Sequence, residues 1–327
     1  MQFRTTFSIP ESLDKISHQQ NILTIGSCFS DEIGGRLVQS KFKGLINPFG
    51  VIFNAFSIEN LVERSINLRY YTLDDVHQNG EQFFCYDVHS SFNALTKEVV
   101  LSDLNATLDQ VHHFLKTCDV LILTLGTSWV YQRIANDQIV ANCHKVEAKK
   151  FEKRLLTTEE NFKSLDLIVF EVLKLNPKMR IITTVSPVRH TKDGMVENNV
   201  SKSRLIDALY QLDSKYDEVD YFPSYELVMD DLRDYRFYKD DLIHPSTQAV
   251  NYIWEQFSAT YFSDSTITLI QKINKINAAL AHRPFNEEAG SHQKFLQKVW
   301  NMMVELEKSG ICFEAEKEIL SKKIQAC

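Results

Sequence analysis

Continuous apolar runs and amphipathic stretches alternate along most of the chain. The runs at 119–125 and 180–185 are rich in Val, Ile and Leu, which is typical of strands buried on both faces of a parallel sheet. Between such runs, apolar residues recur at the spacing of one helix face. The pattern predicts strands at 21–25, 82–88, 119–125, 180–185 and 219–222, two short strands around a turn at Asn136-Asp137, and helices at 30–38, 58–68, 104–115, 157–175, 199–212 and 246–257.

The repeated order of strand and helix indicates βαβ units through residue 262. We therefore expect an α/β domain at 1–262, with a mostly parallel sheet of about five strands. Residues 263–327 have a different pattern, in which isoleucines keep helical spacing and Pro284 and Gly310 interrupt it. This part of the sequence predicts a helical C-terminal extension.

Composition and charge narrow the class of protein. The chain has 327 residues, 44% of them hydrophobic, and a formal net charge of −7. This excludes a disordered chain and argues against binding to nucleic acid or to an anionic membrane surface. No apolar run approaches the roughly 18 residues that span a bilayer, and the N-terminus lacks the apolar segment of a signal peptide. The six cysteines form no CxxC pair, so we expect free thiols, a cytoplasmic location and no metal site.

Reactive residue types follow the predicted strands at their carboxyl ends, where open α/β sheets bind ligands. A thiol, several hydroxyls, imidazoles and a carboxylate are expected to gather at this edge. In chain order the segments are Gly26-Ser27-Cys28, Gly126-Thr127-Ser128, Ser186-Pro187-Val188-Arg189-His190 and Asp241-Leu242-Ile243-His244.

Two of these segments carry the chemistry of a nucleophile and its base. Cys28 lies between a strand end and a helix N-terminus, where backbone N–H groups favour a thiolate, although Asp31 and Glu32 oppose it. The Asp241-x-x-His244 spacing lets the carboxylate hold Nδ1 of the imidazole and leave Nε2 as a base. Each has a structural alternative, in which Cys28 is a small buried residue and Asp241 is a loop carboxylate with His244 as its partner.

Six ordered blocks resemble those of the GSCFA family, a distant branch of the SGNH (GDSL-type) hydrolase superfamily. The resemblance covers roughly residues 1–262 and leaves out the helical extension. It implies a three-layer α/β/α sandwich with a flavodoxin-like sheet. The blocks are Ile25-Gly26-Ser27-Cys28-Phe29-Ser30, Asn47-Pro48-Phe49-Gly50-Val51-Ile52-Phe53-Asn54, Thr124-Leu125-Gly126-Thr127, Val185-Ser186-Pro187-Val188, Tyr221-Phe222-Pro223-Ser224-Tyr225-Glu226 and Asp241-Leu242-Ile243-His244-Pro245.

The resemblance also implies roles for individual residues. Cys28 takes the position of the SGNH nucleophile, and Asp241 and His244 take that of the superfamily's D-x-x-H pair. Gly50 is the nearest match to the oxyanion glycine, but the oxyanion asparagine of the third block is missing here. The remaining residues expected at the oxyanion or substrate positions are Asn54, His89, Gly126, Thr127, Ser128, Ser186 and Arg189.

By this resemblance the chain is a hydrolase or acyltransferase that forms an acyl-enzyme on Cys28, with His244 as base and Asp241 as its orienter. The substrate is an acyl ester or thioester, preferentially an acetyl one, of a sugar, lipid or small metabolite. No cofactor is expected, apart from acyl-CoA as a donor substrate. Ser27 is an alternative nucleophile, one residue out of register. The second hypothesis is a non-catalytic small-molecule or carbohydrate-binding module on the same fold. The acceptor and the oligomeric state stay open.

Overall fold

A computed structural model describes residues 4–282 and 290–325 of the chain. These residues form two compact units, each drawn from separate stretches of sequence. The first, which we call the sheet unit, contains residues 4–9, 21–34 and 44–256. The second, which we call the helical unit, contains residues 10–20, 35–43, 257–282 and 290–325.

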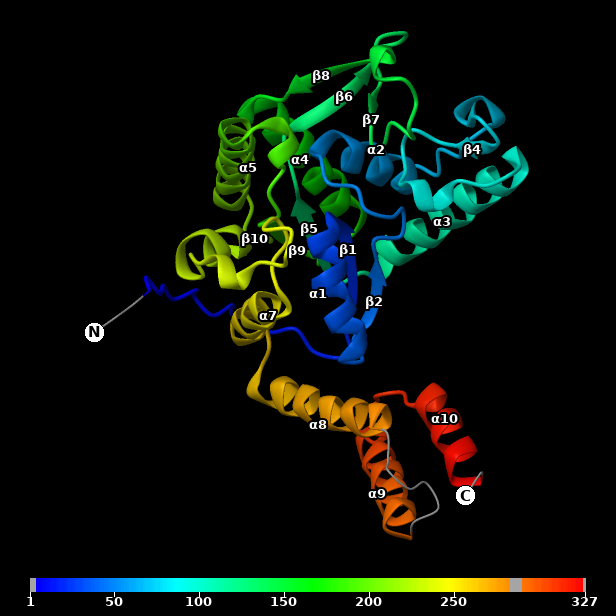
Figure 1. Ribbon diagram of the computed structural model, residues 1–327, viewed down its shortest axis with the longest axis vertical. Helices are drawn as coiled ribbons and strands as arrows, with labels where there is room; N and C mark the ends of the chain where they lie inside the picture. The colour runs from blue at the N-terminus through cyan, green and yellow to red at the C-terminus, as the bar shows by residue number, and fades with distance from the viewer. Residues whose placement is uncertain (1–3, 283–289, 326–327) are drawn as a thin grey trace. The chain divides into compact units, whose positions relative to one another are not determined.

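A five-stranded sheet in the order β10-β9-β5-β1-β2 is the centre of the sheet unit (Figure 1). Its strands are β1 (Asn21–Gly26), β2 (Lys43–Ile46), β5 (Val120–Leu125), β9 (Arg180–Val185) and β10 (Val219–Tyr221). Counted in chain order, these strands follow the arrangement 2-1-3-4-5 of flavodoxin-like folds, with parallel pairing of β1 to β5, β5 to β9 and β9 to β10. The parallel sheet of about five strands is therefore confirmed.

Several helices of this unit begin where polar side chains cap them. Thr157 and Glu160 form the predicted capping box, while Asn54 and Thr96 start two other helices several residues earlier than expected.

No helix among the described residues has the length and apolar character needed to cross a membrane. The helices of this unit are α1 (Cys28–Gln39), which continues into the helical unit, α2 (Ala55–Ile66), α3 (Lys97–Thr117), α4 (Thr158–Leu175), α5 (Met195–Lys215), the short α6 (Ser224–Glu226) and α7 (Thr247–Tyr261), which also continues into the helical unit.

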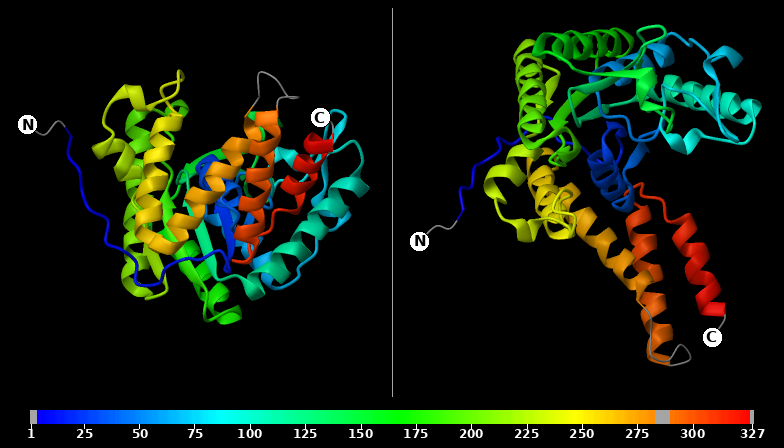
Figure 2. Two further views of the ribbon diagram at one scale, coloured as in Figure 1. Left: turned by 90° about the horizontal axis from the view of Figure 1, so that it is seen from below. Right: turned by 45° about the horizontal axis from the view of Figure 1, so that its top comes forward.

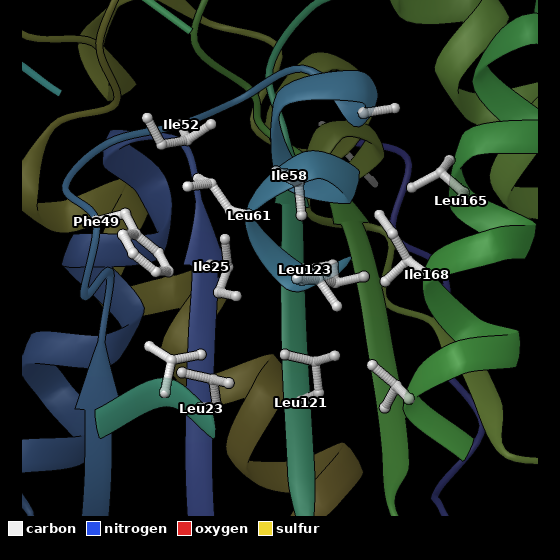
Figure 3. Close-up of a cluster of buried hydrophobic side chains, with 14 of the residues drawn as sticks. Leu23, Ile25, Phe49, Ile52, Ile58, Leu61, Leu121, Leu123, Leu165 and Ile168 are labelled. Atoms are coloured by element: carbon white, nitrogen blue, oxygen red, sulfur yellow. The ribbon is translucent and has the colours of Figure 1, made fainter. Parts of the chain in front are cut away.

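Apolar side chains cover both faces of the sheet, because alternate strand positions point to opposite sides. Leu23 and Ile25 of β1 belong to a buried cluster that includes residues of α2 and α4, as Figure 3 shows. The intervening positions, Ile22 and Thr24, are equally buried on the other face, where α1 and α7 lie (Figure 1). The result is the expected three-layer α/β/α arrangement.

Two small antiparallel sheets lie outside the central one. The first pairs β3 (His77–Asn79) with β4 (Gln82–Phe84), so the strand expected at 82–88 is shorter than predicted. The second has the order β7-β6-β8 and is built from β6 (Trp129–Arg133), β7 (Ile139–Val140) and β8 (Phe151–Leu155). Its turn at Asn136-Asp137 was predicted, but β8 was not, because three consecutive charged residues, Glu152, Lys153 and Arg154, leave it without an apolar run.

The helical unit contains α8 (Asp264–Ala281), α9 (Gly290–Glu307) and α10 (Glu314–Gln325). Figure 2 shows α9 alongside both of the other helices. Their apolar faces meet in one core, and Gly310 forms the turn before α10 with a φ of 80°. Pro284 lies outside the described residues. Upstream segments belong to the same unit: the Ile16 N–H donates to the Tyr261 carbonyl, and Phe42 stacks on Phe262.

Gly26 gives a stability prediction, because β1 and β5 approach so closely there that a side chain has no room. A Cβ at this position would lie 2.3 Å from the Thr124 carbonyl oxygen. Gly26→Ala should therefore lower the free energy of unfolding by about 1–3 kcal/mol, as overpacked core positions do. In Gly35→Ala the new Cβ meets nothing within 4 Å, so this helical control should gain up to about 1 kcal/mol. Urea unfolding of both variants measures the difference, and equal effects would contradict the close approach.

Candidate active site

The site lies where the strand order reverses. The chain leaves β1 toward one edge of the sheet and leaves β5 toward the other, so the loops that follow these strands diverge and leave a crevice at their carboxyl ends. Ser27 and Cys28 follow β1, and Thr127 follows β5. All three line one cavity of about 750 Å³, to which Ser186 and His244 also contribute.

A tight turn from strand to helix places Cys28 at the start of α1. The Ser27 N–H donates to the Thr124 carbonyl at 3.0 Å, and the Ser27 hydroxyl accepts from the Phe29 N–H at 3.3 Å. Ser27 is therefore the capping residue, three residues before Ser30, and α1 begins at Cys28, two residues earlier than predicted. The Ser30 hydroxyl is buried and has no hydrogen-bond partner among the described residues.

The surroundings of Cys28 favour the neutral thiol. Burial raises the pKa of Cys28, and the nearby carboxylates of Asp31 and Glu32 raise it further. A positive charge on Lys202 and the backbone N–H of Cys28 act in the opposite direction. The sequence left the balance between helix dipole and acidic residues open, and the net shift is upward.

Asp241 and His244 form a close pair in the loop before α7. The Oδ2 atom of Asp241 lies 2.6 Å from Nδ1 of His244, while Oδ1 accepts the backbone N–H groups of Ile243 and His244 at 2.9 and 3.0 Å. These hydrogen bonds lower the pKa of Asp241 to about 2. Leu242 adopts a φ of 58°, which closes the turn. The carboxylate therefore orients the imidazole through Nδ1 and leaves Nε2 for proton exchange.

The cavity brings together eight of the twelve residues predicted for the site. The eight are Ser27, Cys28, Asn54, His89, Thr127, Ser186, Arg189 and His244. The other four, Asp241, Gly50, Gly126 and Ser128, are not in its lining. Among the described residues, no group of His, Cys, Asp or Glu has the arrangement of a metal site.

Gly50 belongs to a tight turn beside the cavity. Its backbone N–H donates to the Asn47 carbonyl at 2.7 Å, and its φ is 76°. A Cβ there would come within 2.4 Å of the His89 side chain, so the glycine lets these two loops touch. Asn54 uses Oδ1 to cap α2 through the Ser57 N–H at 2.9 Å. Both residues thus shape the loop that follows β2.

Hydroxyl groups of the segment after β5 bond into the protein interior. The Ser128 hydroxyl donates to the Ser201 carbonyl at 2.9 Å and accepts from Asn161 at 3.2 Å. The Thr127 hydroxyl lies 2.8 Å from the Ser201 hydroxyl and accepts from the Trp129 N–H. This network fixes the segment to α5 and leaves Ser128 fully buried. It occupies the polar atoms that would have to replace the missing asparagine.

Comparison with protein families settles the family. The model of the GSCFA family matches residues 21–257. This chain belongs to the GSCFA family. A second model, described as the GSCFA domain protein, C-terminal domain, matches residues 273–326. The resemblance stated from the sequence is thereby confirmed, and the family also extends over the helical extension. A search of curated proteins found no match.

Similar solved structures include two esterases. One is a carbohydrate esterase of family 3 from Talaromyces cellulolyticus, and the other is an acetyl esterase mutant with an acetate ion. Each is 10% identical in sequence with a TM-score of 0.35, and the alignments cover 78% and 79% of this GSCFA chain and 99% of each neighbour.

Two parts of the GSCFA site were not identified from the sequence. One wall of the cavity comes from the excursion between β5 and α4, including Trp129, Phe151 and Lys153. The second part that was not identified is Lys202 of α5, a side chain that is only 1% exposed. A signal for Lys202 exists, because the apolar stripe of α5 continues upstream at helical spacing onto Ser201 and Lys202.

Arg189 and Lys153 give the cavity a positive wall. The Arg189 guanidinium lies 4.5 Å from the ring centre of Tyr238, and the Lys153 ammonium lies 4.9 Å from that of Trp129. Lys153 forms an ion pair with Asp193, whereas Arg189 has no ion pair among the residues that the structure describes. Lys192 of the same lining likewise forms no ion pair in the described structure, so Arg189 and Lys192 are the cavity cations without a carboxylate partner.

Removing one carboxylate should change the reactivity of the thiol. Asp31→Asn takes away the negative charge that acts most on Cys28, so alkylation of Cys28 by iodoacetamide should extend to lower pH. Glu32→Gln should act in the same direction to a smaller extent. Peptide mass spectrometry across pH 6 to 10 measures the profile. An unchanged profile in Asp31→Asn would contradict this electrostatic description of the site.

Proposed function

We propose that this GSCFA chain is an acyl hydrolase or acyltransferase in which Cys28 is the nucleophile, His244 the base and Asp241 its orienter. One observation carries the proposal: the oriented imidazole of His244 and the thiol of Cys28 line the same cavity. Nucleophile, base and orienting carboxylate are the three parts of a triad, which is recognised by geometry and roles and not by position in the sequence.

The reaction proceeds by two acyl transfers. His244 Nε2 takes the proton from Cys28 Sγ as the sulfur attacks the acyl carbon, a C–S bond forms, and the carbonyl electron pair moves to oxygen. Collapse of this intermediate expels the alcohol or thiol of the donor, which recovers the proton from His244. Water or an acceptor alcohol then loses its proton to His244 and attacks the thioester, and the Cys28 thiol is re-formed.

Backbone N–H groups are the proposed oxyanion donors. Cys28 occupies the first position of α1, where N–H groups have no partner within the helix and the helix dipole favours negative charge. The N–H of Gly50 and the hydroxyls of Thr127 and Ser128 are already bonded within the protein. An active site with few oxyanion donors suits an activated ester or thioester, so acyl-CoA fits as a donor and an amide does not.

The cavity sets the class of substrate. A volume of about 750 Å³ is within the usual range for small-molecule sites. Aromatic side chains such as Trp129 and Phe151, with Arg189 as a polar contact, suit an acylated sugar or small metabolite. We propose an acetyl group as the acyl portion, by analogy with the superfamily that the GSCFA family resembles.

Substitution of the nucleophile tests the mechanism. Cys28→Ala should abolish the hydrolysis of both p-nitrophenyl acetate and acetyl-CoA. The acetylated Cys28 peptide, which mass spectrometry detects in the wild type, should also be absent. Cys312→Ser, which changes an exposed thiol of the helical unit, is the control that should retain both. Activity that survives Cys28→Ala but is lost in Ser27→Ala would transfer the role to Ser27.

The pH dependence tests the base and its orienter. Because the pKa of Asp241 is about 2, this carboxylate remains ionised over the whole acid range of the enzyme. Any loss of activity between pH 7 and about pH 4 should then come from a single protonation that does not involve Asp241, so log kcat/KM should decline with a slope of 1 over this range. A slope of 2 would mean that a second group titrates and would count against the assignment.

Asp241→Asn should reduce kcat/KM at pH 7 by about 10²–10⁴, because the imidazole loses its orienting carboxylate. Asp240→Asn is the matched control, since Asp240 is the exposed neighbour in the same loop and no hydrogen bond in the described structure ties it to the imidazole. Equal losses in the two variants would point to a disturbed loop and contradict an orienting role.

The second candidate function is a small-molecule or carbohydrate-binding module. The raised pKa of Cys28 and the engaged hydroxyls of Thr127 and Ser128 favour it. Calorimetry with acetylated and unacetylated sugars separates the two functions. Binding of the acetylated ligand without turnover or a covalent adduct would support the module and overturn the enzyme.

A further inference from the structure

Lys202 is a buried lysine whose charge acts on the proposed nucleophile, Cys28. It lies on α5 with 1% of its surface exposed, and its Nζ donates to the Ser186 carbonyl at 2.6 Å. Ser186 directly follows β9 and lines the same cavity as Cys28. On a further side, the ammonium lies 6.0 Å from the ring centre of Tyr225. One carbonyl and one aromatic ring give this cation little compensation for the water it has lost.

No carboxylate forms an ion pair with Lys202 within the described ranges of the chain. The charged group that acts on Lys202 is Cys28, and Lys202 acts in turn on Cys28 and on His190. The other charges that act on Cys28 are those of Asp31 and Glu32 on its own helix. Lys202 is therefore the positive charge that opposes both carboxylates at the thiol.

Burial pushes both groups toward their neutral forms, and their interaction pushes both toward their charged forms. Desolvation lowers the pKa of Lys202 to about 7, and a Cys28 thiolate raises it. Burial raises the pKa of Cys28, and the Lys202 ammonium lowers it. Each charge therefore favours the other, as expected for opposite charges that are shielded from water.

We propose that the Lys202 ammonium is the buried positive charge that stabilises the Cys28 thiolate during acyl transfer, which makes Lys202 a positioning residue of this site. The inference rests on the proposed role of Cys28 as nucleophile. No proton passes to Lys202: the Sγ proton goes to His244 Nε2, and the ammonium keeps its three hydrogens. When the thiolate becomes a neutral thioester, Lys202 loses its negative partner until the acyl group leaves.

The test measures the alkylation of Cys28 by iodoacetamide against pH in the full chain. Lys202→Met removes the charge and keeps the length of the side chain, and Lys202→Gln also keeps a donor for the Ser186 carbonyl. Both variants should alkylate Cys28 about tenfold more slowly at pH 6, which lies below the Lys202 pKa of about 7, so that the wild-type lysine carries its charge. Lys163→Met, which removes an exposed lysine of α4, should leave the Cys28 profile unchanged.

Three other thiols act as internal controls in the same samples. Cys312 is exposed and reports the intrinsic rate of the reagent, whereas Cys85 and Cys118 are buried and report unfolding. If Cys28 reacts in the wild type and the Lys202 variants keep its profile, the inference is overturned while the proposed function stands. If Cys28 of the wild type is as unreactive as Cys85, the nucleophile itself is wrong and the proposed function fails.

If both Lys202 variants unfold, the reagent will also label the buried Cys85 and Cys118. A reciprocal measurement then decides the question. In Cys28→Ala the lysine keeps its place and loses its partner, so Lys202 should release its proton at lower pH than in the wild type. NMR of chains labelled with carbon-13 at the lysine Cε position follows this titration. The same titration midpoint with and without Cys28 would overturn the inference.

Discussion

The contact of β1 with β5 at Gly26 is the constraint on which the rest of the site depends. Because no side chain separates Gly26 from Thr124, the Ser27 N–H reaches the Thr124 carbonyl and the chain turns at once into α1. That turn presents Cys28 at the helix start, at the point where the strand order reverses. Cys28 after β1 and Thr127 after β5 thereby line one cavity.

Much of this arrangement follows from local signals in the sequence. The strands at 119–125 and 180–185 were predicted because continuous apolar runs need burial on both faces, and the Asp241–His244 pairing was predicted because three residues of one loop bring the two side chains together. The loops that carry the candidate site residues were expected at the carboxyl edge of the sheet, because open parallel sheets bind ligands there. These features need no knowledge of contacts between distant segments.

The features that were missed depend on such contacts. Residues 10–20 carry no periodic pattern and residues 35–43 begin with the end of a predicted helix, yet both segments pack with the C-terminal helices in one unit. Lys202 is polar, and only its place on the buried stripe of α5 distinguishes it from a surface lysine. β8 pairs with β6 through its backbone, and its charged side chains give no strand pattern. In each case the determining interaction joins positions far apart in the chain.

The cavity wall formed by the excursion between β5 and α4 has a consequence for how the family can diversify. The three short strands of this excursion pair with one another and not with the central sheet, while several of their side chains line the cavity. Insertions or substitutions there can alter which molecules fit without disturbing the register of the main strands. Evolution can thus vary this wall of the cavity separately from the turn that holds Cys28.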